Sequence, residues 1–379
     1  MTRTQPILRT IFLAAALAMT AALSACGNSP DTMGITPANA LNAAELERVF
    51  VVTSRTPSPD RNVLFSAVRS PALHFADITV SVPPKRQTGE IVFPRRKPDL
   101  SRQFAAASIA VTDDESLMAE RLKAELAFWP EGRRTVFVYV HGYNTSFASG
   151  LFRHAQLSHD YGMQGVSLNY SWPSAGKTSL YLYDRDSADF ARAGLVRTLR
   201  IAEAAGPDNI VLIAHSMGTL LTMEALRELS ISGSGHILRR IEALVLASPD
   251  IDMDLFSTQL SSFTARPGVI VAIVSAKDRA LQVSSGARGG QSRLGQAANR
   301  EALEQLGVKV IDSTNFKDQE GSAGHHAFAS SPTMIRMLAN SGLGIGGLAR
   351  SHSGSSADEG LGSEGLSAIE RLKRKITGG

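Results

Sequence analysis

A β-branched apolar run ends at a small-residue turn in Asn209-Ile210-Val211-Leu212-Ile213-Ala214-His215-Ser216-Met217-Gly218, and a helical pattern begins at once. This is the arrangement of a nucleophile elbow, in which a sharp strand-to-helix turn projects a serine hydroxyl above the end of a sheet. The turn needs small neighbours because it brings backbones close together. Ala214 replaces the first glycine of the GxSxG pattern, and Gly218 keeps the second. The stretch therefore predicts Ser216 as a nucleophile.

Short apolar segments recur on both sides of this elbow, and helical patterns separate most of them. Strands are predicted over about 135–140, 166–170, 210–214, 243–246, 269–274 and 308–311, and the clearest helices over 187–204 and 217–229. Asp113 and Asp114 can cap a further helix that runs to about Phe128. Two β-branched segments with proline-rich surroundings, at 49–54 and 78–82, are typical of edge strands. The alternation predicts an α/β fold with a mainly parallel central sheet and helices on both faces. Active sites in such sheets form at the carboxyl ends of the strands.

The first 25 residues have the pattern of a lipoprotein signal peptide. Arg3 and Arg9 precede an apolar run over 11–23 that is short for a membrane-spanning helix, and small residues precede Cys26. Because Cys26 is the only cysteine, it has no disulfide partner, and lipid attachment is the better explanation. An uncleaved or conventionally cleaved leader is the alternative. The sequence thus predicts a lipid-anchored protein of the cell envelope.

The remaining chain divides into three parts by composition. Residues 26–44 are rich in Gly, Asn, Ser, Pro and Thr, which predicts a flexible tether. Residues 45–341 hold the alternating strands and helices and form one predicted domain. Residues 342–379 are Gly- and Ser-rich and end in a basic segment, so we expect a disordered tail with a short basic helix.

Composition and motif searches argue against several classes of function. A net charge of +4 is small for 379 residues and comes partly from leader arginines, so no nucleic-acid partner is expected. There is no HExxH motif and the histidines are scattered, so no metal site is predicted. The Gly176-Lys177-Thr178 triplet lacks the earlier glycine of a phosphate-binding loop, and no cofactor is expected.

A serine hydroxyl needs a base, and the base needs a carboxylate to orient it. In the fold that uses this elbow, the acid follows the serine in the chain and the histidine follows the acid. Asp278 comes just after the predicted strand over 269–274, so it is the favoured acid. Asp250, after the preceding strand, is the competing candidate, although capping of a turn also explains it.

The base is expected beyond the last predicted strand, where His325 and His326 are adjacent. His325 is favoured because the preceding Gly324 allows a close approach, and His326 stays an alternative. His141 lies before Ser216 in the chain, and it is better explained as a packing and hydrogen-bonding residue beneath the site.

Backbone N–H groups must be in place to bind the oxyanion of a tetrahedral intermediate. The residue after the nucleophile supplies one such group, which here is Met217. The second is expected from the loop after 135–140, from Gly142 or Tyr143, with Tyr143 favoured. Asn144 is expected to stabilise this loop through its side chain.

Several separated motifs occur together in one order: VFVVTSR at Val49, VHGYN at Val140, SWPSAG at Ser171, AHSMG at Ala214, SPDID at Ser248, SAKDRAL at Ser275 and GHHAF at Gly324. With them the chain resembles the α/β hydrolases of the esterase/lipase superfamily. More narrowly, it resembles a bacterial family of α/β hydrolases of unknown function, as a lipoprotein-type member. The resemblance covers roughly residues 49–341 and aligns His325 with the family's catalytic histidine. It implies no defined substrate.

The elbow, the chain order and the loop after Val140 predict a serine hydrolase that cleaves carboxylic esters through a Ser-His-Asp triad and an acyl-enzyme, and Cys26 predicts that it is membrane-anchored. The expected partners are a small-molecule or lipid ester substrate and the membrane that Cys26 contacts. The expected location is the periplasmic face of a bacterial membrane, with the outer membrane favoured over the inner. The competing hypothesis is a binding or scaffold lipoprotein that keeps the fold without turning over substrate.

Overall fold

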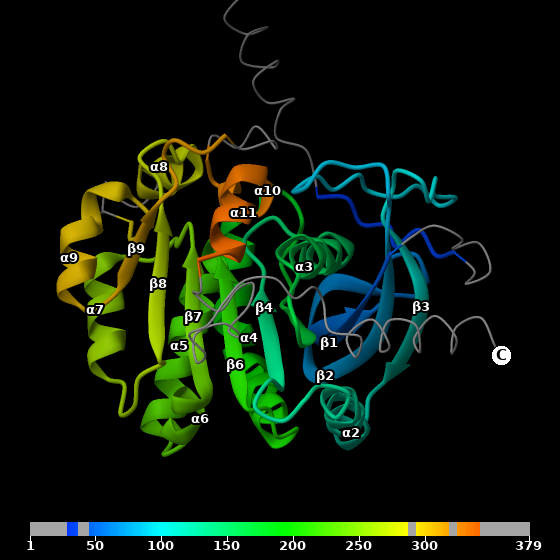
Figure 1. Cartoon of the computed structure of the whole chain (residues 1–379), viewed down its shortest axis with the longest axis horizontal. Coiled ribbons are helices and arrows are strands. Elements are labelled where there is room, and N and C mark those ends of the chain that lie inside the picture. The colour runs from blue at the N-terminus through cyan, green and yellow to red at the C-terminus, as the bar shows by residue number, and fades with distance from the viewer. Residues whose placement is uncertain (1–28, 37–44, 287–292, 318–323, 342–379) are drawn as a thin grey trace, which may run out of the picture.

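The computed structural model of the chain describes residues 29–36, 45–286, 293–317 and 324–341 (Figure 1). The predicted signal peptide over 1–25, the lipidation site at Cys26 and the predicted tail over 342–379 lie outside the described residues.

The described part forms a nine-stranded sheet in the order β3-β2-β1-β5-β4-β6-β7-β8-β9. Strands β1 to β3 pair antiparallel, and every pair from β1·β5 to β8·β9 is parallel. This confirms the predicted mainly parallel sheet. The strands are β1 Glu45–Pro57, β2 Phe65–Val82, β3 Ala105–Thr112, β4 Thr135–Val140, β5 Val166–Ser171, β6 Asn209–His215, β7 Ile241–Ala247, β8 Val269–Val274 and β9 Lys309–Asp312.

Helices cover both faces of the sheet (Figure 1). They are α2 Glu115–Leu126, α3 Phe147–Tyr161, α4 Tyr181–Ala204, α5 Met217–Ile231, α6 Gly235–Arg240, α7 Met253–Ser261, α8 Arg279–Gly286, α9 Arg300–Gln305, α10 Ala327–Ser330 and α11 Pro332–Ala339, with a 3₁₀ turn at Ala297–Asn299. Asp114 caps α2, as the sequence predicts, and accepts hydrogen bonds from the N–H groups of Ser116 and Leu117.

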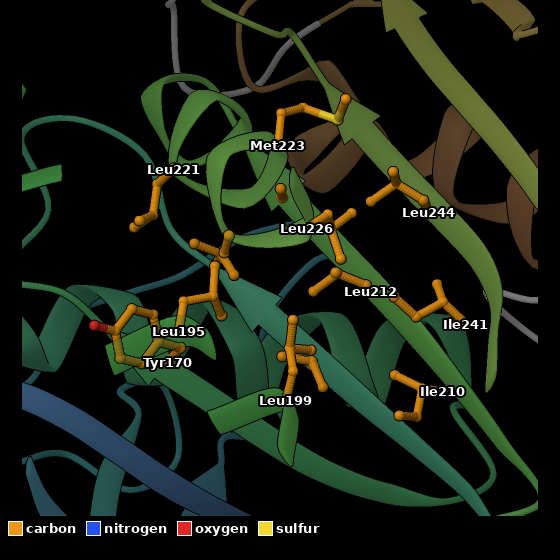
Figure 2. Close-up of a cluster of buried hydrophobic side chains, with 14 of the residues drawn as sticks. Tyr170, Leu195, Leu199, Ile210, Leu212, Leu221, Met223, Leu226, Ile241 and Leu244 are labelled. Atoms are coloured by element: carbon orange, nitrogen blue, oxygen red, sulfur yellow. The ribbon is translucent and has the colours of Figure 1, made fainter. Parts of the chain in front are cut away.

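The five central residues of β6, from Ile210 to Ala214, are all apolar because each face of the strand packs on helices. Ile210, Leu212 and Ala214 belong to a cluster shared with α4 and α5, and Figure 2 shows this cluster around Leu199 and Leu226. The alternate residues, Val211 and Ile213, belong to the opposite cluster with α3 and α11. Successive side chains of a strand point to opposite faces, so a doubly covered strand loses its polar face.

The prediction of edge strands is wrong for the first hairpin. β1 lies between β2 and β5, and β2 lies between β1 and β3. The edge is β3, which sequence reasoning missed because its sequence AAASIAVT is alanine-rich and carries few β-branched residues.

The predicted flexible tether over 26–44 is wrong for residues 29–36. The Met33 side chain is 0% exposed and packs among residues of β1, β2 and α3. Its N–H donates to the Asn62 carbonyl at 2.7 Å, and its carbonyl accepts from the Ala106 N–H at 2.9 Å. The Ser29 N–H donates to the Gly176 carbonyl at 2.9 Å. This segment is therefore part of the folded domain, although its average composition resembles that of a linker.

We expect Met33→Ala to lower the free energy of unfolding by about 2 to 4 kcal/mol, because it removes a fully buried side chain and leaves a cavity. Urea denaturation of the purified domain measures this loss. Leu182→Ala is the matched control, since Leu182 is 77% exposed and its truncation is expected to change the unfolding energy by less than about 0.5 kcal/mol. Equal effects of the two substitutions would contradict the packing of residues 29–36.

Candidate active site

Ser216 lies on the sharp turn between β6 and α5. Its φ of 50° and ψ of −125° are unfavourable for a residue with a Cβ, so the surrounding structure must hold the turn in place. The Ser216 N–H donates to the Ala247 carbonyl at the end of β7, at 2.9 Å. The arrangement is that of the elbow expected from the sequence.

Two glycines allow the backbones around this turn to come together. A Cβ on Gly218 would lie 2.3 Å from the carbonyl oxygen of His141, and one on Gly142 would lie 2.9 Å from the Cβ of Ser216. Both positions therefore exclude any side chain. Ala214 instead lies within β6 opposite Val140 and Leu246, so the departure from GxSxG is accommodated as part of a buried strand.

The structure brings His325 and Asp278 together. His325 Nδ1 lies 2.7 Å from Asp278 Oδ2, and Asp278 is 1% exposed. The other carboxylate oxygen accepts the Leu281 N–H at 3.0 Å, in the first turn of α8, which fixes the carboxylate plane. The His325 carbonyl accepts the Ser248 hydroxyl at 2.9 Å, so the histidine is held at both its backbone and its ring.

The His325 ring lies beside the elbow. Its centroid is 4.9 Å from that of His215, the residue before Ser216. The ring of the predicted base therefore lies next to the turn that carries the predicted nucleophile.

The two competing candidates have other surroundings. Asp250 accepts the Tyr181 hydroxyl at 3.0 Å and the Ser284 hydroxyl at 2.7 Å, and Arg293 Nε lies 3.4 Å from it. The His326 ring lies edge-on to that of His325 at 5.3 Å, on the residue that precedes α10. The pair Asp278 and His325 has the carboxylate–imidazole bond that can orient a base.

Two other histidines near the elbow have lowered pKa values. Burial, with the nearby His326 and His325, lowers the pKa of His215 well below its usual value. Burial, with the nearby Arg55, lowers the pKa of His141 to about 3. The His141 ring stacks on Trp172 at 4.8 Å, and its nitrogens face the carbonyls of Gly142 and Trp172. His141 is thus the packing residue that the sequence predicts.

The loop after β4 carries the second group of site residues. Tyr143 packs edge-on against Tyr181 at 5.3 Å, and its hydroxyl donates to the Thr178 carbonyl. The expectation for Asn144 is wrong, because its side-chain oxygen is buried without a partner while its N–H donates to Asp184 at 3.0 Å. The backbone, rather than the amide side chain, holds this loop.

Asp184 anchors this loop, a role that sequence reasoning missed. This buried carboxylate also accepts the Ser174 hydroxyl and the Ala175 N–H, both at 2.6 Å. Desolvation raises its pKa, although these hydrogen bonds oppose the shift. Its position in the first turn of a helix favours an exposed carboxylate, so the sequence carries no signal for this role.

Arg55 is the second missed residue. Its buried guanidinium donates to Ser171 Oγ at 3.0 Å and to the carbonyls of Ser174 at 3.0 Å and Thr145 at 2.8 Å. It therefore ties the loop after β4 to the loop after β5. The available signal is a charge at the end of an otherwise apolar run, VFVVTSR.

Three residues with positive φ and a side chain gather at the carboxyl ends of neighbouring strands. They are Asn144 after β4 at 54°, Ser216 after β6 at 50° and Ser248 after β7 at 46°. Such conformations cluster at functional sites, where surrounding contacts hold them. Ser248 was not singled out from the sequence.

Within the described ranges, no group of three or more His, Cys, Asp and Glu side chains is arranged to hold a metal ion. The helices that the structure describes are all too short or too polar to cross a membrane.

Comparison with solved structures identifies esterases and lipases of low sequence identity. Carboxyl esterase 2 of Tuber melanosporum is 14% identical, with 56% of this chain and 77% of that chain covered and a TM-score of 0.36. Dienelactone hydrolase of Anabaena variabilis is 12% identical, with 70% of this chain and 89% of that chain covered and a TM-score of 0.36. Esterase 2 of Thermogutta terrifontis, phosphonylated by sarin, is 9% identical, with 81% of this chain and 96% of that chain covered and a TM-score of 0.35. We draw no conclusion about activity from these distant likenesses.

No curated protein matches the chain. The family model described as alpha/beta hydrolase of unknown function (DUF900) matches residues 117–341, which is more than half of the sequence and includes the elbow, Asp278 and His325. The nine-stranded sheet with helices on both faces has the architecture of that fold. The chain therefore belongs to this family of α/β hydrolases of unknown function.

Proposed function

We propose that the protein is a serine hydrolase that cleaves carboxylic esters through an acyl-enzyme. The observation that carries the proposal is the 2.7 Å bond from His325 to the buried Asp278, beside a serine on a strained elbow. A carboxylate at Nδ1 leaves Nε2 of the same ring to act as the base. A histidine with a purely structural role would not need a buried carboxylate at Nδ1 beside the elbow of Ser216.

In the proposed reaction, Ser216 Oγ attacks the ester carbonyl carbon while His325 Nε2 takes the hydroxyl proton. The tetrahedral intermediate collapses when His325 returns that proton to the departing alkoxide, which releases the alcohol and leaves an acyl-serine. Water then attacks the acyl carbonyl and loses a proton to His325, and the acid leaves as His325 gives that proton to Ser216 Oγ, which restores the serine hydroxyl. Asp278 keeps the ring oriented and stabilises its charged form without taking the proton.

The proposed oxyanion donors are the N–H groups of Met217 and Tyr143. Met217 is the first residue of α5, and a first-turn N–H has no carbonyl partner within its own helix. The positive end of the helix dipole adds to its effect. The contact of Gly142 with Ser216 puts the loop that carries Tyr143 against the nucleophile. Two such donors typically contribute a large part of transition-state stabilisation.

We further propose that a lipidated Cys26 anchors the protein at the periplasmic face of a bacterial membrane, the outer membrane being favoured. The support is the leader pattern together with the contact of Ser29 and Gly176. Three residues of chain span at most about 10 Å, so an anchor at Cys26 would lie close to that contact. The exposed Leu180 and Leu182 follow Gly176 in the same loop and first helical turn, where apolar side chains suit a bilayer surface.

Ser216→Ala is expected to lower kcat on a short-chain p-nitrophenyl ester by several orders of magnitude, by analogy with losses of about 10⁶ in a serine protease. The wild type should also react covalently with a fluorophosphonate probe at Ser216, since capture requires an activated serine. Failure of the folded wild type to react would favour a scaffold role. Full turnover by the alanine variant would reject Ser216 as the nucleophile.

The roles of the two carboxylates can be separated by isosteric substitutions. Asp278→Asn should lower kcat by about 10⁴, because an amide facing Nδ1 favours the wrong tautomer of His325. Asp250→Asn should lower it by less than about tenfold, because this side chain contacts Tyr181, Ser284 and Arg293 and not the base. Steady-state kinetics on one neutral ester measures both, and the reverse order of losses would make Asp250 the acid.

Cys26→Ser should move the protein from the membrane fraction to the soluble fraction of the cell envelope while the folded domain keeps its esterase activity. The physical reason is that the acyl chains supply the binding energy to the bilayer. Fractionation followed by immunoblotting measures the shift, with Ser29→Ala as the control that preserves Cys26. Membrane retention of the serine variant would reject the lipid anchor.

A further inference from the structure

Arg293 is a buried arginine with two side-chain nitrogens that make no hydrogen bond. Its side chain is 2% exposed, and its Nε and Nη2 groups have no hydrogen-bond acceptor. The chain's other deeply buried arginine near the site, Arg55, has an acceptor for each of its three nitrogens. A buried donor without an acceptor costs about 1 to 3 kcal/mol, and more for a charged group. The contrast indicates that Arg293 is arranged for an acceptor that the protein itself does not provide.

The segment that carries Arg293 lies beside a loop that contacts the elbow. The Leu294 N–H donates to the Ile251 carbonyl at 2.9 Å, so the segment that carries Arg293 runs along the loop after β7. In that loop, the Asp250 N–H donates to the carbonyl of Ser216 at 3.3 Å. The Arg293 guanidinium is therefore separated from the nucleophile's backbone by a single residue, Asp250.

Asp250 also connects Arg293 to the two tyrosines of the site. Asp250 accepts the hydroxyl of Tyr181, and the Tyr181 ring packs on that of Tyr143, the proposed oxyanion residue. A substrate bound at Ser216 and Tyr143 would thus have Asp250 and Arg293 along one flank.

The two unused nitrogens define the class of acceptor. Nε–H and Nη2–H lie on one edge of the guanidinium and point in parallel, which is the geometry that binds the two oxygens of a carboxylate. Asp250 lies 3.4 Å from Nε, near enough to balance the charge, but its oxygens already accept the hydroxyls of Tyr181 and Ser284. An ester without a negative group would leave both donors unsatisfied.

We propose that Arg293 binds a carboxylate of the substrate, so that the hydrolase acts on half-esters, molecules that carry a free carboxylate besides the ester bond. The inference rests on the proposed serine-hydrolase function and assigns its substrate class. Arg293 is then a specificity residue rather than a participant in the acyl transfer.

The test compares matched esters that differ in one carboxylate. In the first pair, mono-p-nitrophenyl succinate carries a carboxylate on its acyl half and p-nitrophenyl butyrate does not. In the second pair, 4-butyryloxybenzoate carries a carboxylate on its alcohol half and phenyl butyrate does not. The wild type should prefer the charged member of at least one pair in kcat/KM. Arg293→Met should lower that preference by about 10- to 100-fold while changing turnover of the neutral member much less.

Two further variants separate the roles of charge and shape. Arg293→Lys keeps a cation without the parallel donors, so an intermediate preference is expected. Lys177→Met removes an exposed cation in the loop before Tyr181, and it should leave the preference unchanged. A loss in Lys177→Met equal to that in Arg293→Met would mean general electrostatic attraction and would overturn the assignment.

The contrary reading is that Arg293 only neutralises Asp250. In that case Arg293→Met would lower activity on charged and neutral esters alike, and the Asp250→Asn/Arg293→Met double variant would restore both. Absence of any charge preference in the wild type would also reject the proposal. Each variant is also labelled with an uncharged fluorophosphonate. Loss of labelling indicates misfolded protein or a failed triad, whereas normal labelling without a charge preference indicates that the carboxylate site has failed.

Discussion

The contact between the Gly218 backbone and the carbonyl of His141 is the constraint on which the site depends. It closes the first turn of α5 onto the end of β4, and Gly142 consequently meets the Cβ of Ser216. Backbone packing then holds Ser216, the N-terminus of α5 and the loop of Tyr143 in place. Such packing is more rigid than contacts between side chains. Arg55 and Asp184 support the same loop through hydrogen bonds to its backbone and to the loop after β5.

Much of the fold and of the reacting centre could be predicted because the relevant signals are local. Apolar runs of strand length, separated by helical patterns, indicate a parallel sheet, and the end of each run indicates the edge where side chains meet. That edge is shared by Asp278 and His325, which lie 47 residues apart and are joined by a hydrogen bond. In the sequence, chain order rather than any feature of the two residues themselves favours them over Asp250 and His326.

The features that sequence reasoning missed depend on contacts between distant segments. Met33 is an apolar residue in a polar, glycine-containing stretch, and only its packing on β1, β2 and α3 shows that the stretch is folded. Strand β3 is defined by its pairing with β2, since alanine carries no strand preference. Arg293 looks like an ordinary surface arginine in the sequence, and the burial of both Arg55 and Arg293 follows from loops that converge only in the folded chain.

The positive φ angles at Asn144, Ser216 and Ser248 set a balance between stability and catalysis. Each costs on the order of 1 kcal/mol relative to glycine, so glycine at these positions would make the fold more stable. The Ser248 side chain, however, holds the His325 backbone, and the Ser216 hydroxyl is the proposed nucleophile. Selection for thermal stability alone would therefore remove the groups that orient the chemistry, and stabilising substitutions are better sought far from the carboxyl edge of the sheet.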